Sequence, residues 1–278
     1  MPGRVEGKVA FITGAARGQG RSHAVRLAEE GADIIALDVC KQLDGVAFPM
    51  STPDDLAETV KLVEAQDRRI IAGQVDVRDY DAMKALVDEG VADLGRLDIV
   101  VANAGLGSGG APLSAMSERT WQDTIDVNLT GVWLSAKAGI PHIVAGGRGG
   151  AIVLTSSVGG LKAYPNVGHY ISAKHGVVGL MRTLAVELAQ HRIRVNSVHP
   201  TQVNTPMLMH EGTYRLFRPD LEDPTQDDMA PISQMMNTLP VPWVEAVDIS
   251  NAVLFLVSDE GRYVTGVPLP IDAGAMLK

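Results

Sequence analysis

Tyr170 and Lys174 are spaced four residues apart, which places two side chains one turn apart on the same face of a helix. A lysine ammonium beside a phenol favours the phenolate, so we expect Lys174 to lower the pKa of Tyr170 from about 10 toward the working pH. A tyrosine adjusted in this way is a general base for oxidising an alcohol, or a general acid for reducing a ketone. Ser157 lies thirteen residues before Tyr170, at the end of a short apolar run, where its hydroxyl is able to bind the substrate oxygen.

A glycine-rich turn follows the first apolar run of the chain. The sequence TGAARGQG begins at Thr13 and opens directly into a segment of helical periodicity. Gly14, Gly18 and Gly20 permit a tight turn and let the backbone approach a pyrophosphate, which free N–H groups at the helix start stabilise. Because this turn joins the first strand and the first helix of an alternating chain, it predicts dinucleotide binding.

Asp38 and Arg17 bear on which dinucleotide is bound. Asp38 ends the second apolar run, roughly 20 residues beyond the glycines, where a carboxylate binds both ribose hydroxyls of NAD. The same carboxylate repels the 2′-phosphate of NADP, whereas Arg17 in the glycine turn is able to hold that phosphate. Because Asp38 lies at the ribose itself, the sequence favours NAD, and an NADPH-dependent ketoreductase stays open as the alternative.

Short apolar runs alternate with segments of helical periodicity along the whole chain. Most of the runs lack polar alternation, which is typical of parallel strands covered by helices on both faces. The predicted strands are 9–12, 34–37, 70–75, 97–101, 151–154, 193–198 and 267–271, and the predicted helices are roughly 18–30, 54–67, 79–93, 117–142, 169–190 and 244–257. This order predicts an α/β fold: a single doubly wound Rossmann-type domain over 1–278 with a seven-stranded parallel sheet.

Two segments interrupt the alternation. Residues 39–53 lengthen the link after the second strand, and their apolar part, 46–50, is able to pack over a bound cofactor; the alternative is a loose surface insertion. Residues 200–243 hold seven prolines and no strong periodicity, which predicts a substrate lid. Five of the eleven methionines fall there, suited equally to a pliable apolar pocket and to ordinary packing. The acidic residues at 220–228 predict a solvated loop.

Composition excludes several classes of partner. The formal net charge is −9 and no dense Lys/Arg run occurs, which argues against nucleic acid and against an anionic membrane. No apolar run reaches the ~18 residues that span a bilayer. The single cysteine, Cys40, permits no intramolecular disulfide, so we expect a soluble, cytoplasmic protein. The seven histidines show no metal-ligand spacing, and no metal is predicted.

Three further points of the chain are expected to lie around the cofactor. Asp76 follows the third predicted strand, where it is able to accept a hydrogen bond from the adenine amino group. Asn103 follows the fourth strand, and the small residues Ala104 and Gly105 let a dinucleotide lie flat on the backbone. Asn128 lies within the fourth predicted helix.

Taken together, TGAARGQG, the Asn-Ala-Gly at 103–105, Asn128, Ser157 and the Tyr-x-x-x-Lys at 170–174 resemble the short-chain dehydrogenase/reductase family over nearly the whole chain. The resemblance implies that Ser157, Tyr170 and Lys174 are catalytic and that Asn128 holds a relay water near Lys174. Ser156 is expected to point to the opposite face of its strand. The family usually has Pro-Gly where this chain has Pro200 followed by Thr201.

The resemblance further implies that Val203 and Thr205 meet the nicotinamide carboxamide. The catalytic residues predicted from motifs and resemblance together are Asn128, Ser157, Tyr170 and Lys174. The predicted cofactor-binding residues are Gly14, Arg17, Gly18, Gln19, Gly20, Asp38, Asp76, Val77, Asn103, Ala104, Gly105, Tyr170, Lys174, Pro200, Val203 and Thr205.

Gln19, the following Arg-Ser-His-Ala at 21–24 and the extra segment after Asp38 are similar to the mycofactocin-coupled branch of this family, which includes carveol dehydrogenase-like enzymes. This similarity implies NAD that stays bound while a separate redox carrier regenerates it, and the family implies a homotetramer. We expect interconversion of secondary alcohols and ketones, with an apolar or alicyclic substrate under the 200–243 lid. A non-catalytic dinucleotide-sensing protein is the alternative of another class.

Overall fold

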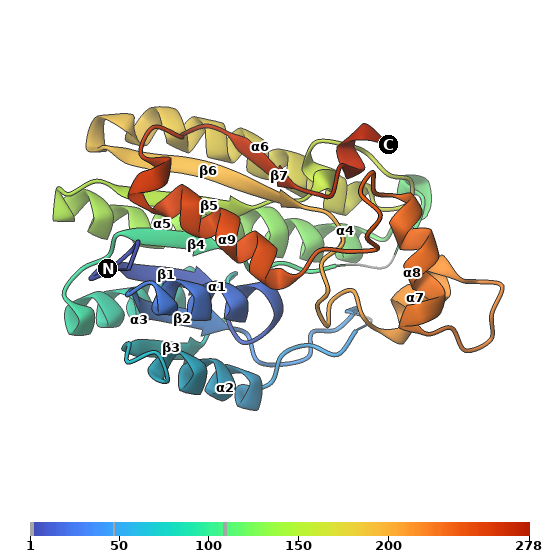
Figure 1. Cartoon of the computed structure of the whole chain (residues 1–278), viewed down its shortest axis with the longest axis horizontal. Helices are drawn as coiled ribbons and strands as arrows, with labels where there is room; N and C mark the ends of the chain where they lie inside the picture. The colour runs from blue at the N-terminus through green and yellow to red at the C-terminus, as the bar shows by residue number, and fades with distance from the viewer. Residues whose placement is uncertain (1–2, 47, 108–109) are drawn as a thin grey trace.

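Seven parallel strands form one sheet, as the sequence predicts, and their order in the sheet is β3-β2-β1-β4-β5-β6-β7. The computed structural model describes residues 3–46, 48–107 and 110–278 (Figure 1). The strands are β1 (Val9–Thr13), β2 (Asp33–Asp38), β3 (Ile70–Gln74), β4 (Ile99–Ala102), β5 (Gly150–Thr155), β6 (Ile193–Pro200) and β7 (Pro268–Ile271). The chain steps outward from β1 to β3 and then returns to the other side of β1, so the winding reverses between β1 and β4.

Helices cover both faces of this sheet. They are α1 (Gly18–Glu29), α2 (Pro53–Glu64), α3 (Tyr80–Leu94), α4 (Glu118–Ile125), α5 (Gly131–Gly146), α6 (Gly168–Leu188), α7 (Glu211–Phe217), α8 (Gln226–Met235) and α9 (Ala246–Val257). Alternate residues of β1 point to opposite faces, because side chains alternate along a strand. Ile12 packs in one apolar cluster with Leu27 of α1, whereas Phe11 packs in the other with Met83 of α3 and Val177 of α6.

The fourth predicted helix, 117–142, is interrupted where the structure has a π-helical turn. Asp126–Thr130 forms this turn between α4 and α5, and its buried members are Val127 and Asn128. Such single turns inside α-helices occur frequently at functional sites. The turn therefore marks Asn128 as a residue with a special position in the fold.

The segment 200–243 contains two helices that the sequence did not predict. Figure 1 shows α7 and α8 together at one end of the molecule, beyond the helices that flank the sheet. The prediction of a solvated loop at 220–228 is wrong at its end, because α8 begins at Gln226 and takes Asp227 and Asp228 into its first turn. The Thr225 hydroxyl accepts from the Asp228 N–H and the Asp228 carboxylate accepts from the Thr225 N–H, which is a capping box.

The long link after β2 is tied to itself and to its neighbours. The amide of Gln42 donates to the carbonyls of Val46 and Phe48, and its oxygen accepts from the Met50 N–H. Ala47, which belongs to the apolar part of this link, lies outside the described residues. Within the described ranges, no helix has both the length and the apolar character needed to cross a membrane.

Candidate active site

Lys174 is a buried cation in the second turn of α6. Its side chain is 3% exposed, and its Nζ donates to the Thr155 carbonyl over 2.9 Å. The same Nζ lies 5.6 Å from the centroid of the Tyr170 ring. Burial lowers the pKa of Lys174 to about 8, because an ammonium loses hydration inside the protein.

The pKa of the Tyr170 phenol differs from the expectation. Burial raises its pKa above the ordinary value, and a hydrogen bond with Ser157 acts in the opposite direction. The expectation that Lys174 lowers the pKa of Tyr170 is therefore wrong for the protein without cofactor. Desolvation of the phenolate raises this pKa by more than the Ser157 hydrogen bond lowers it. Sequence spacing gave the proximity of the two side chains, but it carried no information about burial.

Ser156 and Ser157 follow β5 directly and make different contacts. The Ser156 hydroxyl, 3% exposed, donates to the Lys174 carbonyl over 2.9 Å and so fastens α6 to the end of β5. Both serines line the same cavity as Tyr170, but the Ser157 hydroxyl, which accepts from the Gly159 N–H over 3.0 Å, also forms a hydrogen bond with the Tyr170 hydroxyl. Of the two hydroxyls, Ser157 is thus the one placed toward Tyr170.

His199 binds the backbone of Ser157 and holds it in place, and the sequence did not identify this residue. Its Nδ1 lies 2.7 Å from the Ser157 carbonyl oxygen and its Nε2 lies 2.8 Å from the Ser197 hydroxyl. Burial lowers the pKa of His199 to about 4, so the ring is neutral at pH 7. Because a carbonyl only accepts, the proton sits on Nδ1 and Nε2 accepts from Ser197. Its position next to Pro200 at the end of a predicted strand was the only available signal.

Asn128 fixes the backbone above Lys174. Its Oδ1 accepts from the Leu106 N–H over 2.7 Å, and its Nδ2 donates to the Leu106 carbonyl over 2.9 Å. A Cβ added to Gly105 would lie 3.1 Å from this Oδ1 and 3.6 Å from the Lys174 Nζ. The Asn128 amide is therefore engaged with the chain that follows β4, and Asn128 is not among the residues that line the two cavities described below.

The glycine turn between β1 and α1 brings backbone very close to backbone. Gly14 and Gly18 have φ of +67° and +55°, in the left-handed region that favours glycine. A Cβ on Gly20 would lie 2.0 Å from the Gly14 carbonyl oxygen, which no side chain tolerates. Asn103 closes the turn from β4, since its Nδ2 donates to the Thr13 carbonyl over 3.0 Å.

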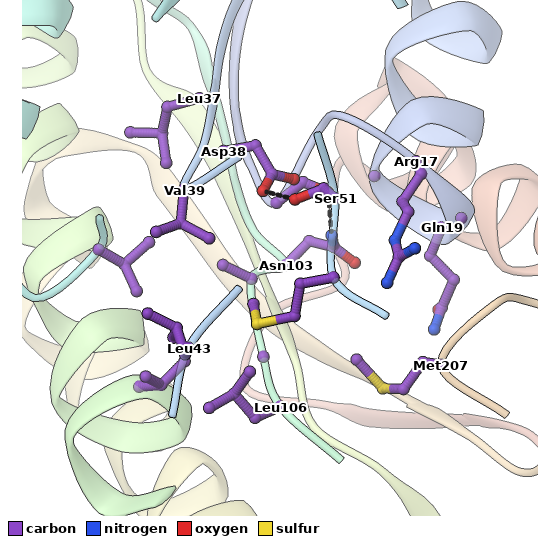
Figure 2. Close-up of a pocket in the computed structure, with 18 of the residues that line it drawn as sticks. Arg17, Gln19, Leu37, Asp38, Val39, Leu43, Ser51, Asn103, Leu106 and Met207 are labelled. Carbon is purple, nitrogen blue, oxygen red and sulfur yellow. Dashed lines mark hydrogen bonds between the residues drawn. The ribbon is translucent and has the colours of Figure 1, made fainter. Parts of the chain in front are cut away.

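Asp38 lies at the end of β2, 8% exposed, with its carboxylate held in place from two sides. Its Oδ2 accepts from the Ala16 N–H over 3.0 Å. Its Oδ1 accepts from the Ser51 hydroxyl over 2.5 Å, as Figure 2 shows. Ser51 belongs to the long link after β2 and was missed by sequence reasoning. Arg17 also reaches this link, because its guanidinium donates to the Pro49 carbonyl.

Two adjoining cavities collect most of the predicted site residues. The first, about 130 Å³, lies between the glycine turn and the link after β2, and Figure 2 shows Arg17 and Gln19 on one side of it with Val39 and Leu43 on the other. Its predicted members are Gly14, Arg17, Gly18, Gln19, Gly20, Asp38, Asp76, Val77, Asn103, Ala104, Gly105 and Thr205. The second, about 450 Å³, has as predicted members Gln19, Asn103, Gly105, Ser157, Tyr170, Lys174, Pro200, Val203 and Thr205.

Asp76 and Cys40 have surroundings that limit their chemistry. The Asp76 carboxylate accepts from the Arg78 guanidinium over 2.6 Å and from the Arg78 N–H over 3.0 Å, contacts that hold its pKa below the ordinary value against the effect of burial. Burial and the nearby Asp38 raise the pKa of the Cys40 thiol to about 12. Among the described residues, no cluster of His, Cys, Asp and Glu could hold a metal ion.

Comparison with known proteins agrees with this geometry. A family model described as short chain dehydrogenase matches residues 8–215. A carveol dehydrogenase of Mycobacterium avium, solved in complex with NAD, is 70% identical with a TM-score of 0.99, over 99% of this chain and 100% of that chain. The (−)-trans-carveol dehydrogenase of Rhodococcus erythropolis is 59% identical over 275 residues, 99% of each chain. A short chain dehydrogenase of Mycobacterium paratuberculosis bound to NAD is 47% identical with a TM-score of 0.90, over 99% of this chain and 100% of that chain.

Proposed function

This chain belongs to the short-chain dehydrogenase family, and we propose that it interconverts apolar, alicyclic secondary alcohols and their ketones with NAD. One observation carries the proposal: Ser157, Tyr170 and Lys174 line one cavity that adjoins the cavity around the glycine turn. An alcohol placed there would meet a proton acceptor at one wall and the dinucleotide at another.

The residues around the first cavity suit the pyrophosphate and the adenosine ribose of NAD. Only glycine satisfies the close approach of Gly20 to Gly14, and that approach opens the backbone N–H groups at the start of α1 to a pyrophosphate. The fixed carboxylate of Asp38 offers acceptors for the ribose hydroxyls. When bound, NAD takes up the hydride from the carbinol carbon of the substrate.

The protein's own residues would handle the proton. Ser157 would hold the alcohol oxygen, and the Tyr170 phenolate oxygen would accept the hydroxyl proton. One of the three Lys174 N–H donors is used by the Thr155 carbonyl, and the other two are the proposed donors to the nicotinamide ribose. The charge of Lys174 would act against the effect of burial on the Tyr170 phenolate.

The substrate cavity supports the proposed substrate class. The residues after β6 supply most of its apolar lining, with Val203, Met207, Leu208, Leu216, Phe217 and Met236 joined by Phe48, Leu106 and Val158. Carveol, the substrate named for the Rhodococcus relative, is an alicyclic secondary alcohol. We therefore propose the segment 200–243 as the substrate lid.

NAD is proposed over NADP because Asp38 and Arg17 are not equally available. Asp38 presents a carboxylate to the cavity, whereas the Arg17 guanidinium is engaged with the Pro49 carbonyl. An added 2′-phosphate would meet the Asp38 charge before it met a free cation. The NADPH-dependent alternative requires Arg17 to leave Pro49.

We also propose that NAD is released slowly and is regenerated in place by a separate redox carrier, as in the mycofactocin-coupled branch. The link after β2 supports this, because Ser51 binds Asp38, Arg17 binds Pro49 and Gln42 ties the link to itself. A cofactor beneath this link leaves only when the link opens, which slows dissociation.

The retention proposal is tested on purified protein without added cofactor. Denaturation should release NAD in near-stoichiometric amount, and native protein should oxidise an alicyclic alcohol with an artificial electron acceptor alone. Arg17→Ala should lose bound NAD faster during dialysis, with Arg26→Ala in the last turn of α1, which lines neither cavity, as the control. Cofactor-free protein that turns over normally on added NAD would show an ordinary exchanging dehydrogenase.

The function itself is tested with a panel of alicyclic and acyclic secondary alcohols, with and without added NAD. Ketone formation that requires Tyr170 supports the proposal. A protein that binds NAD yet converts no alcohol in either assay would be a dinucleotide sensor.

A further inference from the structure

Phe48 belongs to the link that covers the cofactor cavity, yet its ring reaches the substrate cavity. The side chain is 5% exposed and contributes to the lining of both cavities. Its ring lies 5.5 Å, centroid to centroid, from the ring of His210, with the two planes tilted by 31°. His210 immediately precedes α7, in the segment 200–243.

Hydrogen bonds at Phe48 and at the two residues that follow it hold Phe48 in position. The Phe48 carbonyl accepts from the Gln42 amide over 3.3 Å, and the neighbouring Pro49 carbonyl accepts from Arg17. The Gln42 oxygen binds the Met50 N–H over 3.0 Å. With the flanking backbone tied at three points, the ring is held in place at little additional entropic cost.

Three segments distant in sequence converge at this ring. A Cβ added to Gly107 would lie 3.3 Å from the Met207 Cγ and 3.9 Å from the Phe48 Cε1. Met207 comes from the segment after β6 and Gly107 from the chain that follows β4. His210 is fixed in turn, since its Nε2 lies 2.8 Å from the Thr213 hydroxyl of α7.

We propose that Phe48 is a specificity-determining residue, whose ring forms part of the wall against which an apolar substrate packs. The inference rests on the proposed function, which makes the second cavity the substrate site. Because the same ring contacts His210, the link over the cofactor (39–53) and the lid over the substrate (200–243) form one continuous cover over both cavities, which we call the roof. Binding in either cavity then stabilises the roof over the other, and this effect is reciprocal.

The first test measures binding without turnover. Calorimetry on NAD-saturated protein compares cyclohexanone bearing a bulky alkyl group with butanone, in Phe48→Ala and Phe48→Leu. We expect Phe48→Ala to lower the preference for the cyclic ketone about tenfold, within the range found for apolar pockets, and Phe48→Leu to restore part of it. Leu43→Ala is the matched control, because Leu43 lies in the same link and lines the cofactor cavity, while the lining of the substrate cavity does not include it.

An unchanged preference in Phe48→Ala, or an equal loss in Leu43→Ala, would overturn the inference. If wild-type protein prefers the cyclic ketone but turns over no alcohol, the proposed function falls, and Phe48 then selects a bound ligand and not a substrate. If neither ketone binds to folded wild-type protein, the inference falls, while the turnover assay still decides the proposed function. Circular dichroism of each variant establishes that it is folded.

The second test measures release of NAD. In wild-type protein the cyclic ketone should slow NAD dissociation several-fold, because it packs against the shared roof. The ketone should have no such effect in Phe48→Ala, even where that variant releases NAD faster by itself. A ketone effect of equal size in wild type and Phe48→Ala would show that the roof does not couple the two cavities.

Discussion

The Tyr170 hydroxyl contacts Ser157 and faces the second cavity, so its removal isolates one chemical group. Tyr170→Phe keeps the ring and deletes the proton acceptor. We expect kcat for alcohol oxidation to fall about 10²–10⁴-fold, the usual contribution of a general acid–base group, with NAD content unchanged. Steady-state kinetics and quantification of NAD after denaturation provide the two readouts. A variant that kept most of its kcat would contradict the role proposed for this residue.

Lys174 makes stability depend on pH in a defined direction. Its pKa falls from 10.5 in the unfolded chain to about 8 in the folded one, so the cost of burying the charge is fully present below pH 8. As pH rises from 8 toward 10.5, the folded protein releases its proton first and this cost disappears. In cofactor-free protein, Lys174→Met should therefore lose about 2 kcal/mol of stability relative to wild type between pH 7 and pH 10. The free energy of unfolding of both proteins is measured with urea. If the difference between wild type and Lys174→Met did not change with pH, Lys174 would not lose its proton in the folded protein over this range.

Asp38 decides cofactor choice if its carboxylate faces the ribose. Asp38→Ala removes the charge that repels a 2′-phosphate and the acceptors for the ribose hydroxyls. In cofactor-stripped protein we expect the ratio of the binding affinities for NAD over NADP to fall roughly 10–100-fold, as for loss of a hydrogen bond to a charged group. Asp33→Ala, at the opposite end of β2, is the control and should leave this ratio unchanged. Wild-type protein that already preferred NADP would show that Arg17 decides the choice.

Side chains that act through local spacing could be predicted, and those that act through tertiary contacts could not. The four-residue spacing of Tyr170 and Lys174 follows from helix geometry alone. Ser51 meets Asp38 only because a long link folds back, and His199 meets Ser157 only because β5 and β6 are neighbours. The raised pKa of Tyr170 also depends on burial by distant segments.

At the scale of elements, the start of α1 depends on one absent side chain. Gly20→Ala would place a Cβ 2.0 Å from the Gly14 carbonyl oxygen, so the turn must move away from its cofactor-binding shape. We expect this variant to purify without NAD and to unfold at lower temperature. Gly179→Ala is the matched control, since a Cβ there meets nothing within 4 Å and alanine favours the helix by up to ~1 kcal/mol. Full NAD content in Gly20→Ala would contradict the proposed phosphate site.

Strands and helices with regular apolar patterns were easier to predict than a helix such as α8, whose main sequence signal is its N-terminal cap. All seven strands were found, because most of them are short apolar runs without polar alternation, as in a covered parallel sheet. The helix α8 was missed, since Pro231 lies inside it and Pro224 just before it. The pair Thr225 and Asp228 was the available signal, as this spacing matches a capping box.

At the scale of the whole molecule, a parallel sheet collects the site at one edge. The glycine turn follows β1, Asn103 follows β4, Ser157 follows β5 and Thr201 follows β6, so all these segments emerge from the same ends of the strands. The winding reverses between β1 and β4, and ligands of doubly wound sheets bind at that point. This placement could be predicted from alternation alone, whereas the contact between Phe48 and His210 depends on the paths of two long links.

Because one sheet carries the whole site, bound NAD should stabilise the molecule as a unit. A ligand that binds only the folded state adds about 2.7 kcal/mol at one hundred times its dissociation constant. For a chain of 278 residues this corresponds to a rise in Tm of roughly 5 °C. The measurement is a calorimetric scan of cofactor-stripped protein with increasing NAD, and NADP at equal concentration should raise Tm less because Asp38 repels its 2′-phosphate. Gly20→Ala should show little rise with either. A Tm of wild-type protein that did not respond to millimolar NAD would contradict binding at the glycine turn. A ligand that binds the folded protein tightly, and the unfolded chain not at all, must raise Tm.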